Sequence, residues 1–133
     1  MKNICKSVST LKDISSIERI EDKYNINFPK DMIRFFEINN GGIPNKKEFA
    51  INGKEYELRC FLSFNQDEYN SIHKAIDSFQ IETKGKIAPF AKDSADNYYC
   101  INLETGIVYY CSGEENLYFK LTENFNSFLL LLQ

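Results

Sequence analysis

The stretch between Lys86 and Cys111 decides the fold. It reads Lys86-Ile-Ala-Pro-Phe-Ala-Lys-Asp-Ser-Ala-Asp96 and continues as Asn97-Tyr-Tyr-Cys-Ile-Asn-Leu-Glu-Thr-Gly-Ile-Val-Tyr-Tyr-Cys111. Two runs rich in β-branched and aromatic residues flank a short break that contains a glycine, and this pattern is typical of a β-hairpin. Both faces of the hairpin would be largely apolar, which predicts strands that are covered on both sides near the middle of a sheet.

The break sets the predicted register of this hairpin. A three-residue loop Glu104-Thr105-Gly106, with glycine last, places Leu103 opposite Ile107 and Ile101 opposite Tyr109. One face then holds Tyr99, Ile101, Leu103, Ile107 and Tyr109, and the other holds Tyr98, Cys100, Val108 and Tyr110. Cys100 and Cys111 fall on opposite faces, so this register predicts that they do not form a disulfide.

The flanking sequence predicts helices and a second hairpin. Apolar residues at helical spacing predict helices over 15–24, 30–38 and 67–80, the last with Tyr69 on its apolar stripe, and a final helix capped by Thr122. Asn52-Gly53 is the strongest signal for a two-residue hairpin turn. That turn would place Phe49, Ile51, Tyr56 and Leu58 inward and Glu48, Ala50, Glu55 and Glu57 on an acidic outer face.

Composition bounds the class of protein. The chain has 133 residues, the length of one domain, with 43% hydrophobic and 26% charged residues, as in an ordinary soluble protein. The net charge is −3, which disfavours a nucleic-acid binder. The first ten residues lack the apolar run of a secretory signal, and Leu129–Leu132 is too short to span a membrane. We therefore expect a cytoplasmic location.

Few residues offer chemistry. The four cysteines form no CxxC pair, so we expect reduced thiols and no metal or other cofactor. His73 is the single histidine, and no serine or cysteine is placed by the sequence to act with it. Asp93 and Asp96 lie in a turn-forming stretch, where an aspartate side chain bonds the backbone. The sequence thus favours a protein that is not an enzyme and has no catalytic residues.

Three segments in order resemble the SUKH superfamily, whose domain is also called Smi/Knr-like. Phe28-Pro-Lys-Asp-Met-Ile-Arg-Phe-Phe-Glu-Ile-Asn-Asn-Gly-Gly42 resembles its opening pattern. Ile87–Asp93, Asp96–Leu103 and Gly106–Tyr110 resemble its middle block, and Asn124–Leu132 resembles its closing helix. The resemblance runs from about Ser15 to the end of the chain.

The resemblance implies a fold. We expect one SUKH-like α+β domain over residues 1–133, with a bent mixed or antiparallel sheet of about five to six strands flanked by about four helices. For residues 1–14, a loosely ordered arm and an extra helix both remain open.

The resemblance also implies a role. Bacterial members of the superfamily are mostly immunity proteins that bind a cognate toxin, often a nuclease, and block it without catalysis. Other members are interaction scaffolds, including a regulator of cell-wall synthesis, and this alternative stays open. The implied partner is a protein toxin rather than a nucleic acid or a membrane, and the implied state is a monomer or a weak homodimer.

A nuclease binds phosphates through cationic side chains, so we expect its inhibitor to present carboxylates. Two sets are available in the sequence. The favoured set lies in the loops around the central hairpin and comprises Asp93, Asp96, Glu104, Glu114 and Glu115, with Tyr98 and Tyr110 as aromatic anchors unless the core buries them. The alternative set is the outer hairpin face, Glu48, Glu55 and Glu57.

Overall fold

The fold is α+β with antiparallel sheets, as the sequence predicts. The computed structural model describes residues 3–83, 86–112 and 117–133, and for residues 79–83 the backbone alone. Within these ranges the helices are α1 (Ser16–Tyr24), α2 (Lys30–Asn39), α3 (Ile72–Thr83) and α4 (Phe125–Leu130).

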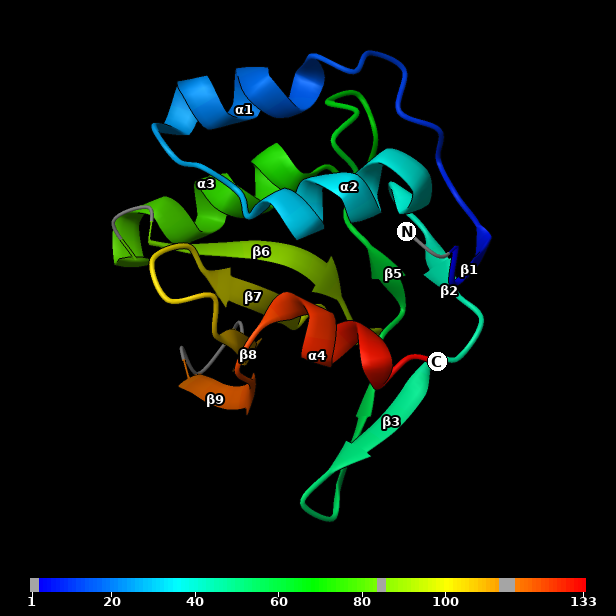
Figure 1. Cartoon of the computed structure of the whole chain (residues 1–133). Coiled ribbons are helices and arrows are strands. Elements are labelled where there is room, and N and C mark those ends of the chain that lie inside the picture. Colours follow the sequence, from blue (N-terminus) through cyan, green and yellow to red (C-terminus); the bar gives the residue numbers. More distant parts are fainter. Residues whose placement is uncertain (1–2, 84–85, 113–116) are drawn as a thin grey trace.

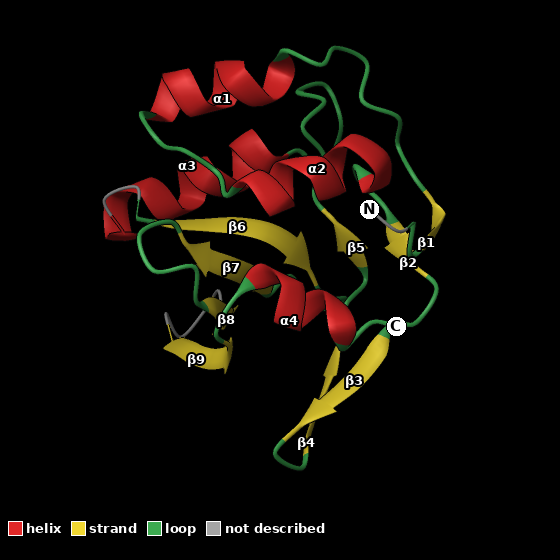
Figure 2. Cartoon of the chain, in the orientation of Figure 1, coloured by secondary structure: helices red, strands yellow, loops and turns green. Residues whose placement is uncertain are grey.

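The main sheet has five antiparallel strands. In spatial order they are β5 (Cys60–Phe61), β6 (Ile87–Lys92), β7 (Tyr98–Asn102), β8 (Val108–Ser112) and β9 (Leu117–Thr122). Two smaller antiparallel pairs join β1 (Cys5–Ser7) to β2 (Ile43–Pro44) and β3 (Glu48–Ile51) to β4 (Lys54–Glu57). Figures 1 and 2 show α4 lying across one face of the sheet, the other helices grouped along one side, and the β3–β4 hairpin projecting from the body.

Aromatic side chains fill the core between α4 and the sheet. The ring of Phe128 in α4 lies 5.4 Å from Phe90 of β6 and 5.5 Å from Tyr99 of β7, centroid to centroid. The four residues of the predicted apolar stripe, Phe125, Phe128, Leu129 and Leu132, are all buried. The predicted cap is wrong, because the side chain of Asn124, not Thr122, accepts the backbone N–H of Ser127 at 2.8 Å.

The Asn52-Gly53 hairpin matches its prediction. Both residues have positive φ, 51° and 80°, and Phe49 lies opposite Tyr56 with their rings stacked. Phe49 also contacts Phe128, with ring centroids 5.7 Å apart, so the base of the projecting hairpin is fixed to the core.

The predicted register of the central hairpin is wrong by one residue. Ile101 lies opposite Val108 and Tyr99 opposite Tyr110. The cause is the side chain of Asn102, whose Oδ1 accepts the backbone N–H groups of Glu104 and Thr105 at 2.9 and 3.0 Å. This Asx-type turn draws Leu103 into the loop, which therefore has four residues rather than three.

The corrected register changes the two faces of the sheet. Tyr99, Ile101, Val108 and Tyr110 now face the core, and Cys100 and Cys111 share the opposite face. The predicted placement of Cys100 and Cys111 on opposite faces is therefore wrong. All four cysteines are nevertheless free thiols, and all four are buried.

Helix α3 starts later than its spacing predicts. The backbone N–H of Ile72 donates to the carbonyl of Ser63 at 2.7 Å, and that of Ser63 donates to Asn70 at 2.8 Å. These bonds hold residues 65–71 in turns beside β5, so the helix begins at Ile72 instead of Asp67. Tyr69, predicted on the apolar stripe, lies outside the helix and is 85% exposed.

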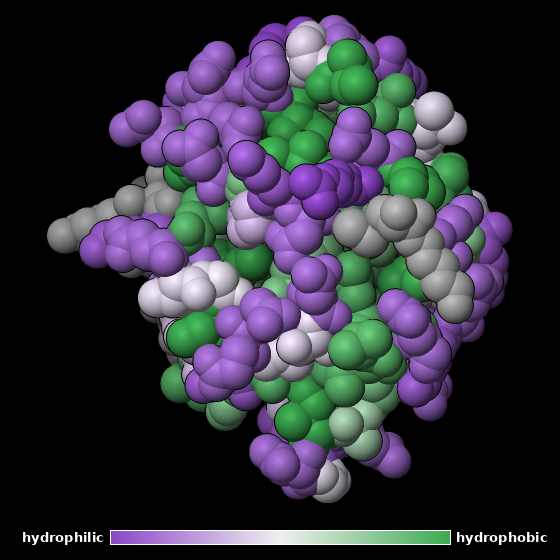
Figure 3. Space-filling model, viewed as in Figure 1, coloured by the Kyte–Doolittle hydropathy of each residue, from purple (hydrophilic) through white to green (hydrophobic). Residues whose placement is uncertain are grey.

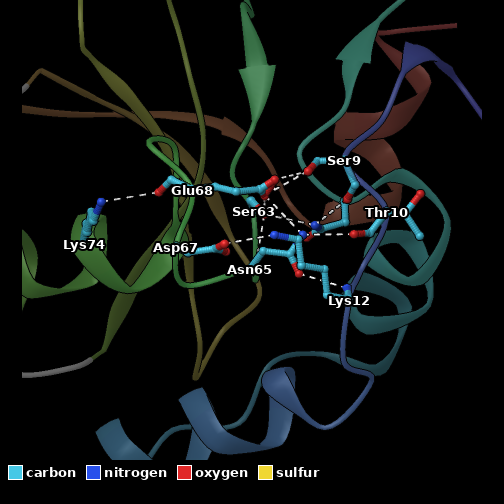
Figure 4. Close-up of polar contacts among 9 residues, drawn as sticks. Ser9, Thr10, Lys12, Ser63, Asn65, Asp67, Glu68 and Lys74 are labelled. Carbon is cyan, nitrogen blue, oxygen red and sulfur yellow. Dashed lines mark hydrogen bonds and ion pairs between the residues drawn. The ribbon is translucent and has the colours of Figure 1, made fainter.

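The N-terminal arm is tied down by a polar network (Figure 4). Residues 3–14 contain strand β1 and no helix. The backbone N–H of Ser9 donates to the carbonyl of Asn40, and the side chain of Asn65 bonds the backbone of both Thr10 and Lys12. Gly42 is required where the arm crosses, because a Cβ there would collide with Cys5 and with the Asn39 carbonyl.

Glu68 is the charged centre of this network. Its carboxylate accepts hydrogen bonds from the Ser9 hydroxyl, from the Ser63 hydroxyl at 2.6 Å and from the Asn65 amide at 3.1 Å. Burial alone would raise the pKa of Glu68, but these hydrogen bonds favour the charged form and hold the pKa below its ordinary value of 4.5.

We predict that replacing Glu68 with Gln weakens the fold and its response to acid. A carboxyl group whose pKa is lower in the folded than in the unfolded protein stabilises the fold at pH values above its ordinary pKa. That stabilisation disappears as the pH falls through the lower pKa of the folded state. The free energy of unfolding at pH 7 should drop by about 1–3 kcal/mol. Urea denaturation at pH 7 and at about pH 3.5 measures both effects.

The exposed Glu37 of α2 provides the control. Glu37→Gln should leave the free energy of unfolding nearly unchanged and preserve its acid dependence. Equal stability of Glu68→Gln and wild type at pH 7 would contradict a role for Glu68 in anchoring the arm.

Candidate interaction surface

The described members of the favoured loop set lie at two different ends of the sheet. Asp93, Asp96 and Tyr98 belong to the turn between β6 and β7 and to the first residue of β7. Glu104 lies in the turn at the opposite end of β7. Glu114 and Glu115 lie outside the described residues. The sequence could not separate the two ends, because that required the order and direction of the strands.

Asp93 is an internal residue with 7% exposure. Its carboxylate accepts the backbone N–H groups of Ala95 and Asn97, each at 2.9 Å, the Asn97 amide and the Tyr110 hydroxyl. Burial, and next the bond to Asp93, raises the pKa of Tyr110. The ring of Tyr110 packs on Tyr56 and Tyr99. Both residues therefore shape the β6–β7 turn from inside.

Asp96 and Glu104 do reach solvent. The side chain of Asp96 is 79% exposed, and its carboxylate lies 3.2 Å from the ammonium of Lys92. Glu104 is 64% exposed and lies 3.8 Å from the Lys86 ammonium. Tyr98 is half-buried, and its pKa is raised mainly by burial. The carboxylates of Asp96 and Glu104 thus each lie beside a lysine ammonium.

The outer face of the β3–β4 hairpin is the more coherent acidic surface. Glu48 lies directly opposite Glu57, and Ala50 lies opposite Glu55. These four residues border a hollow of about 500 Å³. Like charges directly across a strand pair are unfavourable. The nearby cation of this hairpin, Lys54, instead extends over the rings of Tyr56 and Phe119, 5.4 and 4.5 Å from their centroids.

Hydrophobic side chains also reach the surface near this hairpin. On the face in Figure 3 they gather over the end of α4 and the adjoining base of the hairpin. Leu130 of α4 is 66% exposed. Acidic side chains near exposed apolar area are a combination that suits a protein–protein contact.

Glu57 connects the hairpin to the β6–β7 turn. Its carboxylate accepts the backbone N–H of Ser94 at 2.9 Å and the Ser94 hydroxyl at 2.7 Å. Its backbone carbonyl accepts the hydroxyl of Tyr99 at 2.7 Å. The structure therefore brings the two predicted sets together at one point, Ser94, which the sequence did not single out.

The other face of the main sheet carries a row of residues that sequence reasoning did not connect. Cross-strand pairing aligns Lys92, Tyr98, Cys111 and Tyr118 on neighbouring strands. The thiols of Cys100 and Cys111 lie beneath the half-buried side chains of Ile87, Tyr98, Tyr109 and Tyr118. The side chain of Lys92 is only 10% exposed.

Two adjoining hollows open beside Lys92. Their volumes are about 300 and 200 Å³, and both are bordered by Tyr69, Asn70, Lys92 and Asp96. We call this pair of hollows the Lys92 cleft. The ammonium of Lys92 lies 3.4 Å from the Asn70 side-chain oxygen and 5.4 Å from the centroid of the Tyr69 ring. The sequence does not indicate that Tyr69 is exposed or that Lys92 is buried, because both depend on where the strands lie in the fold.

Potential metal ligands do not cluster among the described residues. Nowhere in ranges 3–83, 86–112 and 117–133 do three or more His, Cys, Asp or Glu residues gather as a metal site would require. Burial, with the Lys23 charge next, lowers the pKa of the half-buried His73. None of the helices in these ranges has the length and hydrophobicity needed to cross a bilayer.

Comparison with known proteins places this fold in a family. A search of curated proteins gives no match. The family model described as SMI1 / KNR4 family (SUKH-1) matches residues 13–131. The match begins just before α1 and extends beyond α4, so it includes the main sheet, the hairpin and the Lys92 cleft. Because the match covers well over half of its length, the chain belongs to the SMI1 / KNR4 family, SUKH-1.

Proposed function

We propose that this protein is a cytoplasmic immunity protein that binds a cognate toxin domain and neutralises it by stoichiometric, non-catalytic inhibition. The observation that carries the proposal is the projecting hairpin, with Glu48, Ala50, Glu55 and Glu57 around an open hollow, in a chain of the SUKH family. Members of this family bind partner proteins, and an acidic projection suits a basic partner surface.

The hairpin is a better inhibitory surface than the loop residues for two reasons. Glu48 and Glu55 are exposed, whereas Asp93 is buried and has its hydrogen bonds satisfied internally. The hairpin is also anchored at its base by Phe49 and by the Tyr99–Glu57 bond, so its carboxylates are held in place before binding. Such preorganisation reduces the entropy lost on association.

The hairpin acts by electrostatic attraction in this proposal. A toxin that cleaves nucleic acid must line its active cleft with Lys and Arg to bind phosphates. The carboxylates of Glu48 and Glu55 would occupy that cleft in place of the substrate. Their charges would also steer the two proteins together, which raises the association rate at low salt.

Co-expression tests the function itself. We predict that this protein, produced with the toxin domain encoded beside its gene, restores growth of the host and forms a one-to-one complex. The variant His73→Gln should protect equally well, because the proposed inhibition uses no general base. Loss of protection by a folded His73→Gln variant would contradict non-catalytic inhibition, and absence of protection by the wild type would refute the function.

Charge reversal tests the surface. We predict that Glu48→Lys combined with Glu55→Lys slows association with that toxin domain at least about tenfold and flattens its salt dependence. Stopped-flow or surface-binding kinetics at several salt concentrations measures both effects. Glu57 is kept, because it also holds Ser94.

The matched control reverses two exposed carboxylates elsewhere, Glu37 in α2 and Glu104 in the β7–β8 turn. It changes the net charge by the same amount but leaves the hairpin intact, so its association rate should stay within about twofold to threefold of wild type. Equal slowing by both double variants would show that net charge matters and the hairpin does not.

A further inference from the structure

Strand β3 has an open edge among the residues that the structure describes. The β3–β4 hairpin is a sheet of two strands, and no third strand lies beside it in ranges 3–83, 86–112 and 117–133. The backbone N–H of Leu58 donates to the carbonyl of the directly opposite Lys47 at 2.8 Å. Because bonded and non-bonded pairs alternate along an antiparallel ladder, Glu48 and Ala50 direct their N–H and C=O groups away from β4.

The opposite strand follows the same geometry, but its edge is already in use. Glu57 lies directly across from Glu48, so its carbonyl also points out of the hairpin, and it accepts the Tyr99 hydroxyl at 2.7 Å. The body of the protein therefore occupies the edge of β4 at its base. In the described part of the chain no such bond reaches the backbone of Glu48 or Ala50, and both residues are exposed.

An open strand edge is a template for a further strand. Glu48 and Ala50 each offer one donor and one acceptor on the same edge, and an extended segment laid antiparallel exchanges two hydrogen bonds with each of them. Phe49 lies between them and packs on Phe128, with ring centroids 5.7 Å apart, so the core holds this edge in place before anything binds. Addition of a strand to such an edge is a recurrent way for proteins to bind peptide segments.

Charge selects the segment that fits. Glu48, Glu55 and Glu57 share the outer face of the hairpin. A second copy of the chain would add its own carboxylates to that face, and like charges across paired strands are unfavourable. A segment with lysine or arginine at alternate positions places those side chains over the carboxylates instead. Its intervening side chains meet the inner face, where Phe49 is buried and Ile51 is half-buried.

We propose that strand β3 binds an extended segment of the toxin domain as a third, antiparallel strand of the hairpin. Basic residues at alternate positions of that segment lie over the outer face, and their backbone groups bond Glu48 and Ala50. The inference deepens the proposed function, on which it rests only for the identity of the partner. It adds a main-chain contact to the electrostatic attraction, and this contact fixes the direction and register of the bound segment.

A peptide titration without any toxin tests the open edge. The probe is acetyl-Thr-Lys-Val-Lys-Val-Lys-Thr-amide, added to isotope-labelled protein and followed by NMR hydrogen exchange. At saturation we expect the amides of Glu48 and Ala50 to exchange at least about tenfold more slowly. The amides of Phe49 and Ile51 already face β4 and should change little. Slowing at alternate residues is the signature of an added strand, which attraction between side chains alone does not produce.

Two methylated peptides of equal charge separate strand addition from side-chain attraction. In the antiparallel arrangement the lysine backbone N–H groups face β3, and the valine backbone N–H groups face away. Methylation of the central lysine's backbone nitrogen should weaken binding at least about tenfold, because it removes a donor at the contact. Methylation of one valine's backbone nitrogen should leave binding within about threefold of the parent peptide. Equal binding of the two methylated peptides would overturn strand addition, while the acidic surface of the proposed function would stand.

A proline variant tests the same edge on the protein. Ala50→Pro removes an N–H that faces away from β4, so thermal unfolding should show that the variant still folds. Its affinity for the peptide should fall at least about tenfold, whereas the control Ala50→Ser keeps the N–H and should bind within about twofold of wild type. Equal binding by the two folded variants would contradict the inference, and the methylated peptides decide the question independently of either variant.

The complex with the toxin domain supplies the remaining outcomes. Slower exchange at the Glu48 and Ala50 amides in that complex supports the inference. A one-to-one complex without this protection overturns it and leaves the proposed function intact. Protection along β9, the strand at the end of the main sheet, in place of β3 would overturn it as well. Slowing that appears without peptide as the protein concentration rises would assign the edge to a second copy and rule out a toxin segment.

Discussion

The hydrogen bonds accepted by the Asp93 carboxylate are the interaction on which both candidate surfaces, the acidic hairpin face and the Lys92 cleft, depend. It closes the β6–β7 turn through two backbone N–H groups, and it accepts the hydroxyl of Tyr110 from β8. One side chain therefore links the turn to the neighbouring strand and to the aromatic core beneath it. Hydrogen bonds to a charged acceptor in a buried place are among the stronger ones in proteins. The turn is thereby fixed, and two of its outer residues reach the neighbouring surfaces. Ser94 bonds the hairpin residue Glu57, and Asp96 pairs with Lys92 at the cleft.

This arrangement separates charge on the surface. The hairpin presents carboxylates, whereas Arg59, Lys74 and Lys92 border the two hollows of the cleft together with Asp93 and Asp96. The two surfaces meet at Ser94. A partner with one uniform charge would be attracted by one surface and repelled by the other. A partner with a basic region beside an acidic side chain would be attracted by both, and only in one orientation. Opposite charges placed side by side would therefore discriminate between partners and orientations more effectively than a uniform acidic face.

Local signals in the sequence predicted the elements that local chemistry determines. The Asn52-Gly53 turn depends on two residues that accept positive φ, and the stripe Phe125–Leu132 depends on helical periodicity. The central register was mispredicted because Asn102 can act either as the last strand residue or as the acceptor that closes a turn. Only the geometry of its Oδ1 decides between them. The predicted start of α3 was wrong for a similar reason. Backbone bonds between Ser63, which precedes the predicted helix start, and residues 70 and 72 hold residues 65–71 out of the helix. The candidate site was predicted in part. The acidic hairpin face followed from alternation along the strands. The Lys92 cleft did not, because Tyr69 in the turns before α3 and Lys92 in β6 meet only in the folded chain.

The distribution of unfavourable features within the fold supports this division of roles. Around Phe128 the aromatic rings contact one another at favourable distances, and the polar network of the N-terminal arm is closely bonded. The exception on the hairpin is the pair Glu48 and Glu57, which face each other across the two strands. Like charges in this position lower the stability of the isolated protein, and a cationic group would relieve the repulsion. A feature that opposes folding at a place where a partner would bind is expected of a functional surface.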